Sequence, residues 1–269
     1  MNHPGRPTSG QSRDASRLAD YLKECAVDRL HGDWPVMRKI FVGHARLIAV
    51  VVLSFLSLLF MVLLRYTLAG RFAQSYLLWN LALAAVPVGI AAWGYQLVEK
   101  ARTRRFALAA CFGSFFLWML FFPNAPYIFT DFIHVIRRAN LGSISASWMS
   151  PLDLLWFDIV MNAAFAFVGH YLGLISMYLM HSSLRRLLGR ISGSLLMLPP
   201  MLLSGFGIHL GRFSRFNSWD LFFHPLSATR AILETLAQPS AILFSLAFSF
   251  FIGVTYLIFF LVRKDSSWD

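Results

Sequence analysis

The sequence predicts an all-α, polytopic membrane helix bundle of about six transmembrane helices, with a short amphipathic outer-face helix near residues 125–138. Composition is the first observation: the 269 residues are 57% hydrophobic and 14% charged, whereas a soluble domain carries about 25% charged residues. The second is six long apolar stretches, each of roughly the 17–25 residues that a helix needs to cross the hydrocarbon. The third is that the sequence lacks the segments of about ten residues, alternating between apolar and polar, that a membrane β-barrel would show.

The six stretches define the expected domain organisation. Residues 1–46 form a polar cytoplasmic tail, 47–262 a six-helix transmembrane domain, and 263–269 a second cytoplasmic tail. The first apolar run begins too late in the chain for a signal peptide. In order, the stretches are Leu47–Leu64, Tyr76–Val98, Phe106–Phe122, Leu154–Met180, Ile191–Gly211 and Ala241–Val262.

The distribution of positive charge predicts the orientation. Of the 24 Lys and Arg residues, 17 fall in the two tails and in the second and fourth connections, which all lie on one side. The positive-inside rule then places both termini in the cytoplasm. The net charge of +11 is therefore a topology signal and gives no reason to expect nucleic acid. The two long loops, 123–153 and 212–240, face outward in this topology.

The third apolar stretch runs directly into a polar segment, "FFPNAPYIFTDFIHVIRR". It predicts a helix capped by Asn124, with a proline tolerated in its first turn. At about 100° per residue the apolar side chains share one face. The helix is too short to span a membrane, so it should lie flat in the outer interface or fold back into the bundle. Its narrow polar face carries Tyr127, Thr130, Asp131, His134, Arg137 and Arg138.

The fourth stretch begins with "SPLDLLWFDIVMN", which places Asp158 and Asn162 four residues apart on one helix face. A carboxylate inside an apolar region costs a few kcal/mol unless it faces the bundle interior and finds a partner. Two interpretations stay open. Asp158 is either held by Asn162 or an arginine for packing, or it takes part in binding or catalysis.

The fifth stretch contains Pro199 and Pro200, which should kink it, and Gly207 and Gly211 near its end. These glycines, and a second pair at residues 169 and 173, predict close helix packing. Polar residues follow on the outer side. Arginines there contact lipid phosphate, recognise an anionic group, or pair with Asp131 or Asp158. The residues concerned are His209, Arg212, Arg215, Asn217, Trp219 and Asp220.

Three classes of function fit these features. The first is an enzyme acting at the outer leaflet on a lipid or lipid-linked anionic substrate. In that hypothesis Asp131 and His134 act as a general base and its orienter, or bind a divalent cation with Asp158. The substrate would contact Asn124, Tyr127, Thr130, Asn162, His209, Arg212, Arg215, Asn217, Trp219 and Asp220.

The second class is a small-solute or ion transporter that uses the same polar cluster. The third is a structural or assembly protein in which this cluster is a fully paired network. Membrane lipids are the expected partners in each case. The sequence leaves the metal, the cofactor and the oligomeric state open.

Three segments, "FFPNAPYIFTDFIH", "LLWFD" and "GFGIHLGRFSRFNSWD", resemble a bacterial membrane-protein family known as domain of unknown function 1361. The resemblance runs from about Tyr76 to the end of the chain, and the N-terminal tail lies outside it. It implies a multi-pass protein of the bacterial cytoplasmic membrane. It implies no particular activity.

Overall fold

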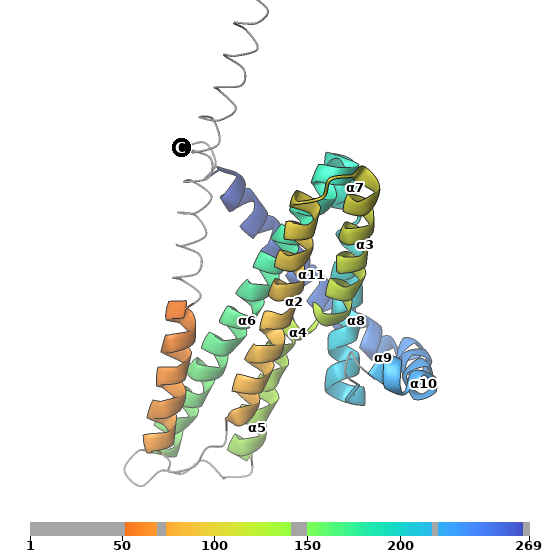
Figure 1. Ribbon diagram of the computed structural model, residues 1–269. Coiled ribbons are helices and arrows are strands. Elements are labelled where there is room, and N and C mark those ends of the chain that lie inside the picture. The colour runs from red at the N-terminus through yellow and green to blue at the C-terminus, as the bar shows by residue number, and fades with distance from the viewer. Residues whose placement is uncertain (1–51, 69–73, 141–149, 217–219, 266–269) are drawn as a thin grey trace, which may run out of the picture. The chain divides into compact units, whose positions relative to one another are not determined.

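A computed structural model describes residues 52–68, 74–140, 150–216 and 220–265 of the chain (Figure 1). The chain divides into two units, Met1–Ser57 and Leu58–Asp269, and the contacts discussed below lie within the second. The predicted N-terminal tail, residues 1–46, lies outside the described residues, as do the last four residues of the predicted C-terminal tail.

The described residues form helices and no strand, as the sequence predicts. Among the described residues, five helices are long and apolar enough to cross a membrane, so the protein is an integral membrane protein. The predicted first stretch overlaps a shorter apolar helix, Val52–Leu68, which lies at the lower limit of spanning length. The five longer segments are Ser75–Glu99, Arg104–Ala139, Pro151–Leu188, Arg190–Ser214 and Pro239–Val262.

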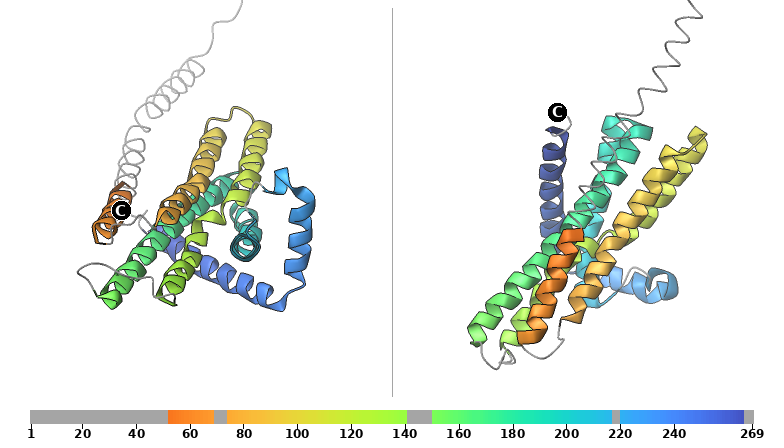
Figure 2. Two further views of the ribbon diagram at one scale, coloured as in Figure 1. Left: turned by 90° about the horizontal axis from the view of Figure 1, so that it is seen from below. Right: turned by 60° about the vertical axis from the view of Figure 1, so that its left-hand side comes forward.

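Helices α2 (Ser75–Glu99) and α3 (Arg104–Phe121) pack against each other, and α6 (Pro151–Leu188) runs along α2 (Figures 1 and 2). The 38 residues of α6 correspond to about 57 Å, well beyond the roughly 30 Å of a hydrocarbon core. Its start is capped by Ser150, whose hydroxyl accepts from the backbone N–H of Asp153. It ends at Gly189, whose φ of 88° favours glycine.

The segment that follows α3 is helical in three short pieces: α4 (Asn124–Tyr127), the 3-10 turn η1 (Ile128–Asp131) and α5 (Phe132–Asn140). It packs on α2 and α6, so of the two expected placements the structure has the one folded into the bundle. The predicted cap at Asn124 is wrong. Pro123 precedes α4 with helical φ and ψ. The backbone N–H groups of Ala125 and Tyr127 already donate to the carbonyls of Phe122 and Pro123.

The predicted fifth span is interrupted near its prolines. Helix α7 (Arg190–Leu195) ends, a turn follows, and α8 (Leu198–His209) begins with Pro199 and Pro200 in its first turn. The π-helical turn η2 (Leu210–Ser214) extends α8. After it come α9 (Asp220–Phe223), α10 (Pro225–Leu236) and α11 (Pro239–Asp265), and α11 packs on α8.

Both predicted glycine pairs pack against the α4 region. A Cβ atom added to Gly173 of α6, or to Gly207 of α8, would lie 3.0 Å from a side chain of residues 122–127. One added to Gly211 would lie 3.1 Å from the ring of Tyr127. Small residues on both sides therefore allow α4 to be enclosed between α6 and α8.

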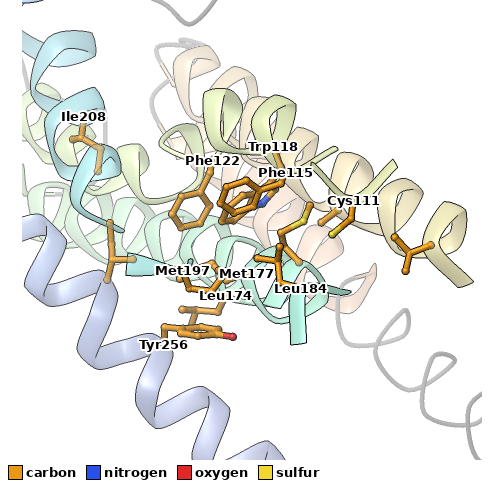
Figure 3. Packing of buried hydrophobic residues seen from close by; sticks show 14 residues of the cluster. Cys111, Phe115, Trp118, Phe122, Leu174, Met177, Leu184, Met197, Ile208 and Tyr256 are labelled. Atoms are coloured by element: carbon orange, nitrogen blue, oxygen red, sulfur yellow. The ribbon is translucent and has the colours of Figure 1, made fainter. Parts of the chain in front are cut away.

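The largest group of buried apolar side chains lies where α2, α3, α6, α8 and α11 meet (Figure 3). Trp118 is fully buried and stacks on Phe122 with ring centroids 4.7 Å apart. Its indole N–H donates to the hydroxyl of Ser176 at 3.0 Å, so its polar atom is satisfied. This core fixes the end of α3, from which the α4 region continues.

Candidate functional site

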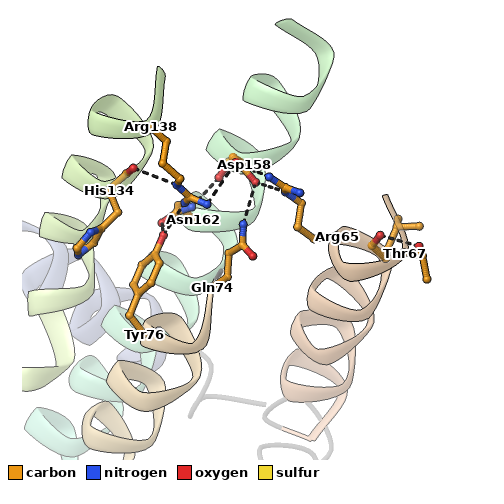
Figure 4. A network of polar contacts seen from close by, with 9 residues as sticks. Arg65, Thr67, Gln74, Tyr76, His134, Arg138, Asp158 and Asn162 are labelled. Carbon is orange, nitrogen blue, oxygen red and sulfur yellow. Dashed lines mark hydrogen bonds and ion pairs between the residues drawn. The ribbon is translucent and has the colours of Figure 1, made fainter. Parts of the chain in front are cut away.

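Asp158 of α6 is fully buried and held by arginine (Figure 4). Arg65, from the helix Val52–Leu68, donates to its carboxylate through Nε at 2.6 Å and Nη2 at 3.2 Å. This two-point contact is the geometry in which guanidinium and carboxylate bind most strongly. Arg138 of α5 adds a second guanidinium at 3.7 Å, and Gln74 donates at 3.5 Å. The predicted pairing of Asp158 with an arginine is thus present.

Asn162 contacts Asp158 through the main chain. Its Nδ2 donates to the Asp158 carbonyl at 2.7 Å, while its Oδ1 accepts from the hydroxyl of Tyr76 at 3.2 Å. The Tyr76 oxygen in turn accepts from Arg138 at 3.0 Å. Asn162 therefore joins α6, α2 and α5 without touching the carboxylate.

Asp131 of η1 is the centre of a second cluster and is 1% exposed. Asn80 of α2 donates to its Oδ2 at 2.6 Å, and Arg212 of η2 donates to its Oδ1 at 2.5 Å. Arg212 also donates to the hydroxyl of Thr130 at 2.7 Å and lies over the ring of Tyr127, 4.6 Å from its centroid. The predicted pairing of Arg212 with Asp131 is thus present.

His134 lies between the two clusters. Its Nε2 is 4.0 Å from Asp131 Oδ1, beyond the 2.6–3.2 Å or so at which a base and its orienter share a proton. Its ring packs on that of Tyr76 with centroids 4.4 Å apart. The side chain is 38% exposed, which makes it the most accessible member of the predicted catalytic trio. The catalytic roles of Asp131, His134 and Asp158 stay predictions.

A cavity of about 510 Å³ lies beside the Asp131 cluster, within the roughly 300–1,000 Å³ of small-molecule sites. Its wall comes from α2, α3, α4, α8, η2 and α10, and most of it is apolar. Asn80 and Tyr127 belong both to this wall and to the Asp131 cluster. The polar cluster and the apolar cavity therefore adjoin along those two side chains.

Asn124 is the third polar group of note in the wall. Its Nδ2 is buried and has no hydrogen-bond partner. An unpaired buried amide costs about 1–3 kcal/mol, and a group left in that state needs an explanation, such as an absent ligand or water. Because Asn124 is also a residue of the cavity wall, this unpaired donor belongs to a side chain that borders the cavity.

The cavity reaches the protein surface. Trp79 and Phe116 line it and are also 62% and 61% exposed, and Leu203 on the facing helix is 49% exposed. On an integral membrane protein, exposed aromatic and aliphatic side chains on spanning helices face the bilayer. The mouth of the cavity is thus bordered by lipid-facing residues.

The other predicted site residues lie elsewhere or outside the described residues. His209 packs its ring against Phe213, 4.5 Å away between centroids. Arg215 is exposed and has a positive φ of 56°. Asp220 begins α9, where its carboxylate lies 3.9 Å from the imidazole of His224. Asn217 and Trp219 lie outside the described residues.

Within the parts of the chain that the structure describes, no group of three or more His, Cys, Asp or Glu side chains could hold a metal ion. Sequence reasoning missed Arg65 and Gln74, neither of which was among the predicted site residues. A signal was present, because Arg65 directly follows a long apolar run, "FMVLL". A cation at such a position is costly unless it finds a partner in the bundle.

Comparison with known families supplies the identity. The family described as "Protein of unknown function (DUF1361)" matches residues 79–255. The chain belongs to the DUF1361 family. No match was found among curated proteins or among solved structures.

The matched range contains the whole wall of the cavity, from Trp79 to Ile232, and both buried carboxylates. Arg65 and Gln74 precede it. The cavity and the Asp131 cluster are therefore built entirely from the DUF1361 part of the chain, whereas the Asp158 cluster also uses residues before it.

Proposed function

We propose that this DUF1361 protein binds a lipid-like molecule in the cavity, with the apolar chain against α3 and α8 and the polar end at Asn80 and Asn124. The observation that carries the proposal is the cavity itself: about 510 Å³, mostly apolar, with one buried amide that has no partner. Apolar pockets with a few placed polar groups are typical of ligand sites.

The mouth supports a ligand that arrives from the bilayer. Trp79 and Phe116 both line the cavity and are largely exposed, so an acyl or prenyl chain can enter sideways and exchange one apolar surrounding for another. A water-soluble ligand would instead have to pass exposed apolar side chains that favour lipid.

Binding is better supported than acid–base catalysis. Asp131 and Asp158 each contact at least one guanidinium within 2.6 Å. An arginine partner engages the carboxylate lone pairs with which a general base would accept a proton from a substrate. In the proposal the Asp131 cluster positions Asn80 and Tyr127 at the polar end of the cavity.

A structural role is the second candidate, and a specific observation favours it. The two clusters join through Tyr76, His134 and Arg138 into one network that connects the helix Val52–Leu68 with α2, α5, α6 and η2. Such a network fixes the register of the helices, whether or not the cavity holds a ligand. Loss of folding without loss of ligand binding per folded molecule would be its signature.

The proposal also includes a location. Both termini lie in the cytoplasm and the protein lies in a bacterial cytoplasmic membrane; the supporting facts are the charge distribution and the family resemblance described above. To test this, single cysteines are introduced at residues 10 and 267 of the protein. Intact cells are then treated with a thiol reagent that does not cross membranes. Labelling of either terminus before lysis would contradict the topology.

The test of binding uses a cavity-filling variant. Ala228 of α10 lines the cavity and is 3% exposed, whereas its neighbour Ser227 is exposed. We expect the full chain, extracted in mild detergent, to retain a co-purifying lipid-like molecule detectable by native mass spectrometry. Ala228→Phe should lose it, and Ser227→Phe should retain it. Equal retention by both variants, at equal yield of folded protein, would refute a site in this cavity.

A further inference from the structure

The charge of the cavity wall restricts the ligand further, and the argument rests on the proposed function. Among the described residues that line the cavity, none is charged. The polar side chains of the wall are amides, a phenol and an indole. An anionic group placed there would lose its hydration without meeting a cation in the wall, which is costly in a low-dielectric site.

The nearest ionic groups belong to the Asp131 cluster, and they compensate each other. Asp131 and Arg212 form an ion pair at 2.5 Å, and the Nε–H of Arg212 donates to the hydroxyl of Thr130. His134, a further titratable side chain beside Asp131, lies 4.0 Å from its carboxylate. The pair presents little net charge toward Asn80 and Tyr127, so on this side Arg212 acts as half of a neutral ion pair and not as an uncompensated cation.

The hydrogen-bonding groups of the wall are complementary to a neutral head group. Asn124 offers a donor, its unpaired Nδ2. Asn80 donates one hydrogen of its Nδ2 to Asp131, and its carbonyl oxygen can accept from a ligand hydroxyl. A hydroxyl both donates and accepts and can satisfy the two amides together, whereas a phosphate dianion only accepts.

From these facts we propose that the cavity selects an uncharged amphiphile whose head carries a hydroxyl group, such as a monoacylglycerol or a long-chain alcohol, over one that carries a phosphate. The ligand chain lies along the apolar wall, and the head accepts from Asn124 and donates to Asn80. This differs from the first of the three hypotheses from the sequence, in which the substrate is a lipid or lipid-linked anionic molecule.

The test compares two probes that differ only in the phosphate: a monoacylglycerol with a dibrominated chain, and the lysophosphatidic acid with the same chain. Bromine quenches nearby tryptophan fluorescence, and Trp79 lines the cavity. Because Trp79 is also exposed to the surrounding lipid, the quenching that reports on this site is the part removed both by Trp79→Phe and by the cavity-filling Ala228→Phe. Other tryptophans, and probe outside the cavity, supply the background. The full chain in detergent micelles or nanodiscs is used throughout.

We expect the monoacylglycerol to give Trp79-dependent quenching at a concentration about tenfold lower than the phosphate probe does, because a single unmade hydrogen bond or unpaired charge has roughly this effect. Asn124→Leu should weaken the monoacylglycerol about tenfold. Asn124→Lys, which adds a cation to the wall, should turn the preference toward the phosphate probe.

The outcomes separate the two proposals. Equal or tighter binding of the phosphate probe by the wild-type chain would overturn the preference for a neutral head group and leave a lipid-binding cavity in place. No Trp79-dependent quenching by either probe, from protein that is folded by size-exclusion chromatography, would overturn the proposed function itself.

Discussion

Arg212→Gln tests whether the ion pair of the Asp131 cluster holds the fold together. The Asp131 side chain is 2% exposed, and the variant leaves its carboxylate with Asn80 as its remaining close donor. Breaking a buried pair by removing one partner costs about 3–5 kcal/mol. Because Arg212 is itself 15% exposed, water replaces part of the lost contact, and we expect the lower end, about 3 kcal/mol.

For a domain of this size about 3 kcal/mol corresponds to a fall of on the order of 10 °C in the thermal midpoint. Removing the charge from the partner should recover part of the loss. We therefore expect the double variant Asp131→Asn with Arg212→Gln to be about 2 kcal/mol more stable than the sum of the two single changes predicts.

The assay is thermal unfolding of the purified chain in one detergent, followed by size-exclusion chromatography of the soluble fraction. Arg137→Gln is the matched control, because Arg137 is an exposed arginine on α5, the helix that directly follows Asp131. It should stay within about 0.5 kcal/mol of wild type. Strictly additive effects of Asp131→Asn and Arg212→Gln would show that the two residues do not stabilise each other, and the network account would be wrong.

Three further changes have distinct expected results. Asn124→Leu should leave the free energy of unfolding unchanged or raise it by up to about 1 kcal/mol, because it removes a buried amide nitrogen that has no partner. A clear fall in stability would mean that this nitrogen is hydrogen-bonded. Gly205→Ala should cost about 1–3 kcal/mol, since the added Cβ meets backbone of α11, whereas Gly113→Ala, with open space around it, should not destabilise. Trp118→Phe should cost about 1–3 kcal/mol by leaving a void and removing the bond to Ser176, and an unchanged midpoint would contradict the packing described.

The bundle was predictable from the sequence because lipid imposes strict requirements on composition and length. The segment at residues 124–140 was predictable in part. Its helical periodicity placed Thr130 and Asp131 on one polar face, and in the structure both accept hydrogen bonds from Arg212. The cap at Asn124 was wrong, because a capping residue cannot be told from a continued turn when the preceding residue, Pro123, takes helical angles.

The partners of the buried carboxylates depend on distant segments. Asp158 pairs with Arg65 across 93 positions of sequence, and no local pattern encodes such a contact. The pairing of Arg212 with Asp131 was one of several open alternatives. The cavity was not predictable at all, because it is defined by which side chains of α3, α8 and α10 fail to fill the space between them.

The central claim, that a lipid-like molecule occupies the cavity, is tested most directly by photocrosslinking. A lipid with a diazirine in its acyl chain is added to membranes that contain the full chain, and labelled residues are mapped by mass spectrometry. The account predicts labels on Leu120 and Phe206, which line the cavity, and their loss in Ala228→Phe. Labels confined to outward-facing residues such as Leu246 and Phe250 of α11, unchanged in that variant, would contradict it.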